Sequence, residues 1–502
     1  KTETYLEAVA QCLRTGRQAL VMLPEIALTV DFLARVEKRF GMRPPEWHSG
    51  LTGAQRRRTW EAAATGEARL VVGARSALFL PFADLGLVVV DEEHDSSYKQ
   101  EEGVLYHARD MAVLRASIED AAVVLASATP SLETWVNAEA GKYRRLDLPE
   151  RFGGAMMPEM RAVDLRADPL PPGRWISASL AEAVTARLGA GEQSLFFLNR
   201  RGYAPITVCR ACGFQIGCPD CDARLVEHRF SARLVCHQCG HEAPIPTACP
   251  SCETEGRLAV LGPGVERLAE EAEQLWPEAR IAVLSSDLAD GPKALKARID
   301  LIASGGADIV IGTQIVSKGH NFPQLTLVGV IDADLGLHGG DLRAAEKTFQ
   351  LIRQVAGRAG RADRPGLALV QTHAPDHPVI EAILTGDDEG FWREEAEARR
   401  RAGAPPFGRL AGIVVSGLDE TRTWDTAQAL ARAAGPLHDA GALLFGPAPA
   451  PIARVRGRHR VRLLVKAAKG VPLQGAIRAW LARVPVPSGI RVAVDIDPQS
   501  FM

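Results

Sequence analysis

Eight of the nine cysteines constrain the fold most strongly, because they fall in one short segment as four Cys-x-x-Cys pairs. Two thiolates at this spacing can hold one edge of a tetrahedral metal site, and two such pairs complete a site of four sulfurs. Disulfides are the competing interpretation, but the clustering favours metal and a reducing compartment. The sequence therefore predicts two Zn²⁺ ions, bound by Cys209, Cys212, Cys218, Cys221, Cys236, Cys239, Cys249 and Cys252.

The pairing of these cysteines follows less directly from their spacing. A hairpin-like stretch, residues 222–235, separates the two inner pairs and suits one shared site, around which the outer pairs would close. His228, His237 and His241 lie nearby, but eight thiolates leave these histidines as neighbours rather than ligands. Such a module is expected to be a rigid platform that contributes binding rather than bond chemistry.

Short apolar runs alternate with helical patterns along most of the remaining chain. A first series of runs begins at Ala19, Arg69, Leu85 and Ala121. A second series comprises SLFFLN, RLAVLG, RIAVL, ADIVIGT, LTLVGVIDAD and GLALVQT. Continuous Val and Leu runs separated by helices are typical of parallel strands buried on both faces. The sequence thus predicts two α/β blocks, with the cysteine segment inserted near the start of the second. After about His377 it predicts a smaller region of short strands and helices.

Charge and hydropathy restrict the possible partners. The formal net charge of -2 gives no global basic excess, so nucleic acid is expected to be bound only at local patches. No run of about 20 apolar residues is present, which argues against a membrane span. No secretory signal is visible, although a chain that starts within a motif can have lost one. Together with the clustered cysteines, these features indicate a cytoplasmic protein.

Acidic residues follow the hydrophobic run from Leu85, which reads LGLVVVDEEHD. The carboxyl edge of an open α/β sheet is where ligands bind. There Asp91 can hold Mg²⁺, commonly through water, and the adjacent Glu92 can orient or deprotonate an attacking water. The alternative is a strand that ends in a solvated acidic turn.

Two further motifs point to a nucleotide. Lys1 and Thr2 open a helical pattern, as the last two residues of G-x-x-x-x-G-K-[ST] do, although Lys-Thr pairs are common. Arg358 and Arg361 lie three apart in QVAGRAGR and can project to one side, where guanidinium groups stabilise charge on a transferred phosphoryl group. A solvated basic helix face is the alternative for these arginines.

Together these segments resemble superfamily 2 helicases, and among them the PriA family of primosomal replication-restart helicases. The resemblance rests on KTETYL, HSGLTGAQR, DEEHDSSYKQEEGVLYHARD and the block ending in QVAGRAGR, and it covers essentially the whole chain. It implies two RecA-like lobes with ATP between them, an inserted two-zinc module and a small α+β carboxyl-terminal domain. The expected domains are 1–150 (first lobe), 151–207 (connection and start of the second lobe), 208–254 (zinc insertion), 255–375 (second lobe) and 376–502 (carboxyl-terminal DNA- or partner-binding domain).

The resemblance also implies roles for individual residues. Lys1 and Thr2 would bind phosphate and Mg²⁺, Asp91 would hold Mg²⁺, and Glu92 would be the general base. Arg358 and Arg361 would be arginine fingers from the second lobe. The zinc ligands would be nested, with Cys209, Cys212, Cys249 and Cys252 in one site and Cys218, Cys221, Cys236 and Cys239 in the other.

The activity implied by the resemblance is that of an ATP-dependent 3′→5′ DNA helicase, monomeric, cytoplasmic and nucleoid-associated. Its partners would be forked and single-stranded DNA, single-strand DNA-binding protein and other primosome proteins. Family members carry a DNA-binding region and a glycine-rich phosphate loop before the position of Lys1, so residues 1–502 alone are expected to hydrolyse ATP weakly. The alternative function is a non-catalytic, zinc-bearing scaffold for DNA and primosome proteins.

Two segments are candidate DNA contacts. The stretch after the acidic motif offers aromatic and basic side chains for stacking and phosphate binding, namely Tyr98, Lys99, Tyr106, His107 and Arg109. The segment PAPAPIARVRGRHRVRLLVK carries the basic residues Arg454, Arg456, Arg458, His459, Arg460 and Arg462. The alternation in its last part, RVRLLVK, predicts a strand with a basic face for phosphate or an acidic protein tail. A solvated edge strand protected by charge is the competing interpretation of this second segment.

Overall fold

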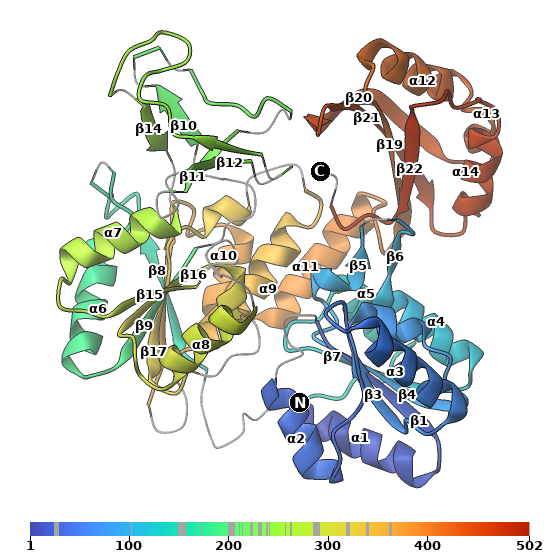
Figure 1. Ribbon diagram of the computed structural model, residues 1–502, viewed down its shortest axis with the longest axis horizontal. Coiled ribbons are helices and arrows are strands. Elements are labelled where there is room, and N and C mark those ends of the chain that lie inside the picture. Colours follow the sequence, from blue (N-terminus) through green and yellow to red (C-terminus); the bar gives the residue numbers. More distant parts are fainter. Residues whose placement is uncertain are drawn as a thin grey trace. The chain divides into compact units, whose positions relative to one another are not determined.

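The computed structural model divides the chain into two compact units, Lys1–Glu150 and Arg151–Met502 (Figure 1). The structure describes all residues except 25–29, 102, 149–156, 172, 199–205, 210, 213, 221–223, 229–232, 237–238, 240, 257, 262–263, 285–291, 318–321, 338–340, 361–363 and 501–502. Within the described ranges, no helix has both the length and the apolar character needed to cross a bilayer.

The first unit is built on a five-stranded parallel sheet with strand order β2-β3-β1-β4-β7. Its central strands are largely apolar, and β1 is buried at every position, as expected for a sheet covered on both faces. The strands are β1 (Gln18–Met22), β2 (Glu46–Trp47), β3 (Leu70–Gly73), β4 (Leu85–Asp91) and β7 (Ala122–Ala126), with a small hairpin of β5 (Lys99–Gln100) and β6 (Tyr106–His107). The helices are α1 (Thr2–Arg14), α2 (Val30–Phe40), α3 (Gly53–Thr65), α4 (Ala108–Ile118) and α5 (Leu132–Glu139).

The second unit contains a six-stranded parallel sheet in the order β15-β16-β9-β17-β18-β8. Its strands are β8 (Glu159–Asp164), β9 (Gln193–Phe197), β15 (Ile281–Leu284), β16 (Ile309–Gly312), β17 (Leu325–Val330) and β18 (Leu367–Thr372). The accompanying helices are α6 (Ala178–Gly189), α7 (Val265–Leu275), α8 (Pro292–Ala303), α9 (Ala344–Ala356), α10 (Pro378–Thr385) and α11 (Asp388–Arg401). The core includes Leu180, Phe196, Leu268 and Leu327.

One run of the second series was misplaced by the sequence interpretation. RLAVLG forms β14 (Leu258–Leu261), which pairs antiparallel with β10 (Ile206–Cys209) instead of joining the six-stranded sheet. These two strands are the two ends of the cysteine insertion, so their pairing closes that insertion. The remaining edge position of the large sheet is occupied by β8, whose side chains are largely exposed or half-buried and carry no continuous apolar signal.

The cysteine segment also contains a three-stranded antiparallel sheet, β11-β12-β13. Its strands are β11 (Val226–His228), β12 (Arg233–Val235) and β13 (Glu242–Pro244). The predicted hairpin between the inner cysteine pairs is confirmed by the pairing of β11 with β12.

The carboxyl-terminal region is an α+β domain with a four-stranded antiparallel sheet, β20-β21-β19-β22. Its elements are β19 (Gly408–Gly417), α12 (Glu420–Arg432), α13 (Gly435–Asp439), β20 (Leu443–Val455), β21 (Arg458–Ala468), α14 (Leu473–Leu481) and β22 (Arg491–Ile496). In β21, Val461, Leu463 and Val465 are buried while Arg462 between them is exposed, so the predicted alternating strand is confirmed. The edge-strand alternative is wrong, because β21 lies between β20 and β19. The fold-class prediction, two α/β units with a cysteine-rich insertion and an α+β domain, is confirmed.

Candidate functional site

The acidic motif lies at the carboxyl end of β4, which pairs with β1 and β7 in the first parallel sheet, and Asp91 is the last residue of the strand. The ammonium group of Lys1 bridges the two acids that follow one another there. Lys1 Nζ lies 2.8 Å from Asp91 Oδ1 and 2.5 Å from Glu92 Oε1. Lys1, the residue before α1, and the end of β4, far apart in sequence, therefore form one charged cluster.

Hydrogen bonds fix Asp91 from three directions. The buried Tyr5 hydroxyl donates to Asp91 Oδ2 at 2.9 Å, and the Glu92 amide donates to Asp91 Oδ1 at 2.9 Å. The Tyr98 hydroxyl lies 2.7 Å from the Asp91 carbonyl oxygen and 3.0 Å from the Met22 carbonyl oxygen, and these two acceptors share its single hydrogen. This framework holds a carboxylate in one orientation, which a water-mediated Mg²⁺ site requires. Tyr5 carried no signal in the sequence as a partner of this acid.

Glu92 has a positive φ of 48°, a conformation that costs energy for any residue with a Cβ. Such strain persists only where surrounding contacts impose it, and it is concentrated at functional sites. Here the ion pair with Lys1 is one of those contacts. Burial alone would lower the pKa of Lys1, but the charges of Glu92 and Asp91 outweigh it and raise that pKa. Lys1 is therefore cationic at neutral pH.

Glu93 is fully buried and ties the acidic motif to two helices. Its carboxylate accepts hydrogen bonds from the Ser131 amide at 2.7 Å, from Thr134 Oγ1 at 2.9 Å and from Arg109 Nη1 at 3.2 Å. Ser131 is also the amino-terminal cap of α5, since its side chain accepts from the Thr134 amide. Alongside, His94 Nδ1 lies 2.7 Å from Ser127 Oγ, which brings Ser127, the residue after β7, against the acidic motif.

The candidate DNA contacts after the acidic motif need correction. Tyr98, Lys99 and Arg109 are only 1%, 4% and 3% exposed, so the expectation that they contact DNA is wrong. Tyr98 and Arg109 instead hold β4 and the helices around it in place. Tyr106 and His107 are half-buried, and the Tyr106 ring packs edge-on against Phe79 at 5.0 Å.

The remaining predicted nucleotide residues are placed as follows. Thr2 is the first residue of α1 and is half-buried. Arg358 follows the end of α9 in the second unit and is also half-buried. Arg361 lies outside the described residues.

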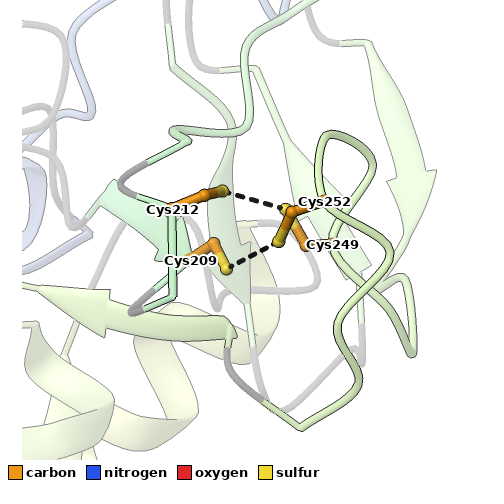
Figure 2. Close-up of side chains that lie close together, drawn as sticks. All are labelled: Cys209, Cys212, Cys249 and Cys252. Atoms are coloured by element: carbon orange, nitrogen blue, oxygen red, sulfur yellow. Dashed lines mark hydrogen bonds between the residues drawn. The ribbon is translucent and has the colours of Figure 1, made fainter.

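The outer cysteine pairs form one four-sulfur cluster (Figure 2). The Sγ atoms of Cys209 and Cys252 lie 3.7 Å apart, as do those of Cys212 and Cys249. A tetrahedral site with Zn–S bonds of about 2.3 Å has sulfur–sulfur edges of roughly 3.8 Å, whereas a disulfide needs about 2.05 Å. The donor set therefore fits Zn²⁺.

Hydrogen bonds within the first cluster also suit thiolates. The Ala211 amide donates to Cys209 Sγ and the Ser251 amide to Cys249 Sγ, both at 3.4 Å. Thr254 Oγ1 lies 3.3 Å from Cys252 Sγ, and hydrogen bonds with the Thr254 side chain and amide lower the pKa of Cys252 to about 6. In the same cluster, the hydrogen bond from the Phe214 amide alone would lower the pKa of Cys212, but the neighbouring cysteine sulfurs and burial outweigh it and raise that pKa to about 11. The lowered pKa therefore belongs to Cys252 and not to the whole cluster. Thiolate formation favours metal binding.

The inner cysteines form a second cluster, in which Cys218, Cys236 and Cys239 come together. The Sγ atoms of Cys218 and Cys239 lie 3.6 Å apart, again a tetrahedral edge rather than a disulfide. Cys221 lies outside the described residues. The clusters follow the nested order, with the inner site enclosed in sequence by the outer one.

Three family models match the chain. The description "DEAD/DEAH box helicase" matches residues 1–137. "PriA DNA helicase Cys-rich region (CRR) domain" matches residues 218–244, and "Primosomal protein N C-terminal domain" matches residues 400–499. The three matches fall on the first unit, the inner cysteine cluster and the carboxyl-terminal domain.

Curated relatives agree over the full chain. The replication restart protein PriA of Rickettsia felis is 42% identical over 501 residues, covering 100% of this chain and 77% of the relative. The replication restart protein PriA of Bacillus subtilis is 39% identical over 506 residues, covering 100% of this chain and 63% of the relative. That of Treponema pallidum is 38% identical over 507 residues, covering 100% and 76%. With a helicase domain, a zinc-binding cysteine module and full-length similarity of this degree, the chain belongs to the PriA family of replication restart helicases.

Proposed function

We propose that this chain contains the motor of an ATP-dependent DNA helicase that translocates 3′→5′ during replication restart. The observation that carries the proposal is the ion-paired cluster of Lys1, Asp91 and Glu92 at the carboxyl edge of a parallel sheet. Membership of a helicase family supports it. The alternative, a non-catalytic scaffold, does not explain why Glu92 is held in a strained conformation.

In the proposed mechanism, ATP would bring its phosphates to Lys1, and Mg²⁺, when bound, would neutralise the phosphate oxygens. Thr2 and Asp91 would hold the cation, with Asp91 kept in orientation by Tyr5. Once Lys1 turns to phosphate, Glu92 is released from its ion pair and can accept a proton from the attacking water. Arg358 and Arg361 would supply guanidinium groups to the developing negative charge.

Glu92→Gln tests the proposed base. We expect the DNA-stimulated ATPase rate to fall by about 10²–10⁴-fold while ATP binding persists, because the amide keeps the shape but cannot take the proton. The measurement is phosphate release with forked DNA, on protein expressed from its complete gene. Glu61→Gln, an exposed acid on α3, is the matched control and should leave the rate unchanged. Equal rates for the two variants would favour the scaffold.

Unwinding of partial duplexes with only a 3′ or only a 5′ single-stranded end tests polarity.

We also propose two Zn²⁺ per chain, and forked and single-stranded DNA as substrates. Single-strand DNA-binding protein and other primosome proteins are the proposed partners. The basic segment from Arg454 through β21 is the proposed phosphate-binding surface. Several of its arginines donate to backbone carbonyls of the chain: Arg454 to Pro219, Arg458 to Ser416 and Gly489, and Arg460 to Ile452.

Arg456 and Arg462 are exposed, so they test the phosphate-binding surface most directly. We expect the double substitution Arg456→Ala and Arg462→Ala to reduce the slope of log K against log salt by about 1.5, because two phosphate contacts are lost. The measurement is DNA affinity by fluorescence anisotropy at several salt concentrations. Arg483→Ala, an exposed arginine after α14, is the control. A slope equal to that of the control contradicts this assignment.

A further inference from the structure

The turn between β20 and β21 is a tight two-residue turn with an unusual composition. Val455 pairs with Arg458 across it, and its central residues Arg456 and Gly457 have φ of 50° and 72°. Turns with positive φ at both central positions strongly favour Asn, Asp and Gly, so an arginine there is held at some cost. External contacts that stabilise the turn would explain how that cost is offset.

Such contacts reach the second cysteine cluster. The Gly457 amide donates to the Asp220 carbonyl at 2.8 Å, and Arg454 Nη2 donates to the Pro219 carbonyl at 2.8 Å. Pro219 and Asp220 are the two residues between Cys218 and Cys221. The turn therefore binds the backbone of a Cys-x-x-Cys loop from outside, through the carbonyl groups of both residues between the ligands.

An apolar contact joins the same partners. Val455 packs against the small core of the zinc module, which includes Ile216, Leu225, Leu234 and the ligands Cys218 and Cys236. Both hydrogen bonds and the apolar contact thus involve the second cluster, and they link a domain that starts near residue 400 to a module some 200 residues earlier in the chain.

We propose that the β20–β21 turn is the docking partner of the second zinc site, so that occupancy of this site by Zn²⁺ anchors the hairpin of the carboxyl-terminal domain. The physical basis is that the Pro219 and Asp220 carbonyl groups must point toward the turn to accept its two hydrogen bonds. A Cys-x-x-Cys loop acquires a single backbone conformation when both sulfurs bind one metal, and small zinc modules lose their structure without it. Without zinc, the Pro219 and Asp220 carbonyls have no fixed direction and the Val455 contact surface disperses.

This coupling is reciprocal by thermodynamic necessity, because docking and metal binding stabilise the same conformation. Zinc in the second site therefore protects the hairpin, and the docked hairpin slows zinc loss from that site. The coupling rests on the proposed occupancy of the second site by Zn²⁺ and does not depend on ATP hydrolysis. Its consequence is that loss of one metal ion would free a hairpin that carries exposed basic residues.

Hydrogen exchange of the Gly457 amide tests the first direction. In Cys236→Ser, which removes a ligand of the second site, we expect this amide to exchange about tenfold faster, because its hydrogen bond to Asp220 is lost. In the matched variant Cys252→Ser, which removes a ligand of the first site, its protection should be retained. Protection of β19 serves as the folding control in both variants. Equal protection of Gly457 in the two variants overturns the proposal.

Zinc release to a colorimetric chelator tests the reverse direction with all cysteines intact. Val455→Asp should release one of the bound zinc ions several-fold faster than the unaltered chain, since a charge at this half-buried apolar contact disrupts docking. Val486→Asp, at a valine that is 43% exposed in the same domain, is the control. If Val455→Asp releases zinc at the rate of this control, the proposal is overturned. Should Cys236→Ser lose protection in β19 as well, that variant has disturbed the whole domain, and the zinc-release experiment is then the deciding one.

Discussion

Replacing Arg399 by Met is expected to lower the free energy of unfolding of the Arg151–Met502 unit by about 3–5 kcal/mol. Arg399 is 2% exposed, and its guanidinium lies among three acceptors. Its Nε donates to Glu395 Oε1 at 2.8 Å, Nη1 to the Pro405 carbonyl at 3.2 Å and Nη2 to Glu346 Oε2 at 3.2 Å. Removal of the cation takes from Glu395 its arginine partner and from Glu346 one of its arginine partners, since Arg343 Nη1 also donates to Glu346 Oε2 at 3.1 Å. The negative charge that is then less compensated causes the loss.

This network joins two helices, so its loss is expected to affect both of them. Glu346 belongs to α9, the helix that leads to Arg358, whereas Arg399 belongs to α11, which leads into the carboxyl-terminal domain. The stacked rings of Phe349 and Phe391, 3.9 Å apart, join the same two helices. Arg399→Met should therefore raise hydrogen exchange in both α9 and α11, besides shifting the urea midpoint.

Two variants complete this experiment. Arg401→Met, on an exposed arginine of the same helix, should change the stability by less than about 0.5 kcal/mol. Arg399→Lys should recover only part of the loss, because one ammonium group cannot reproduce the planar fork that reaches three acceptors. If Arg399→Met unfolds at the same urea concentration as Arg401→Met, the network does not stabilise this unit.

Cys249→Ser is expected to remove one equivalent of zinc per chain and to unfold the region around the first cluster. Apparent zinc binding to structural sites is worth about 10–16 kcal/mol at neutral pH, and this energy is folding energy for a small module. The cluster holds β10 and β14 together, since Cys209 ends β10 and Cys249 and Cys252 lie shortly before β14. Loss of the site should therefore expose the amides of both strands to exchange, while the two parallel sheets keep their protection.

The measurement is zinc per chain by atomic emission, followed by hydrogen exchange. Cys12→Ser is the control, because Cys12 lies in α1 outside both clusters and its Sγ is 3.4 Å from the Gln18 carbonyl. It should keep the full zinc content. If the Cys249→Ser variant, with its sequence verified, holds as much zinc as Cys12→Ser, the first cluster is not a zinc site.

Some parts of this fold were accessible from the residues because they depend on local pattern. Strands such as β1 and β4 are buried on both faces, so they must be continuous apolar runs and are visible as such. The cysteine pairs can be recognised in the sequence because two sulfurs that bind the same metal ion from one loop need a fixed, short spacing. The strand β8 was not visible, since its side chains are largely exposed or half-buried at the edge of the sheet.

Other interpretations failed because the same types of residue occur both on binding surfaces and in buried structural contacts. Tyr98, Lys99 and Arg109 suit a DNA-binding surface by composition, yet each is buried, and Arg109 is used to satisfy Glu93. The run RLAVLG has the apolar pattern of a core strand but closes the zinc insertion. Whether a polar side chain faces solvent or a buried partner depends on contacts that no local pattern records.

The order of residues along the chain was enough to determine the class of fold, the metal chemistry and the acidic strand end, because each rests on spacing within a few residues. Only the tertiary structure decided which distant groups meet. Examples are Tyr5 and Lys1 at Asp91, Arg399 at Glu346, and the β20–β21 turn at the second zinc site. These contacts join segments separated by tens to hundreds of residues, and their geometry follows from how the sheets and helices pack.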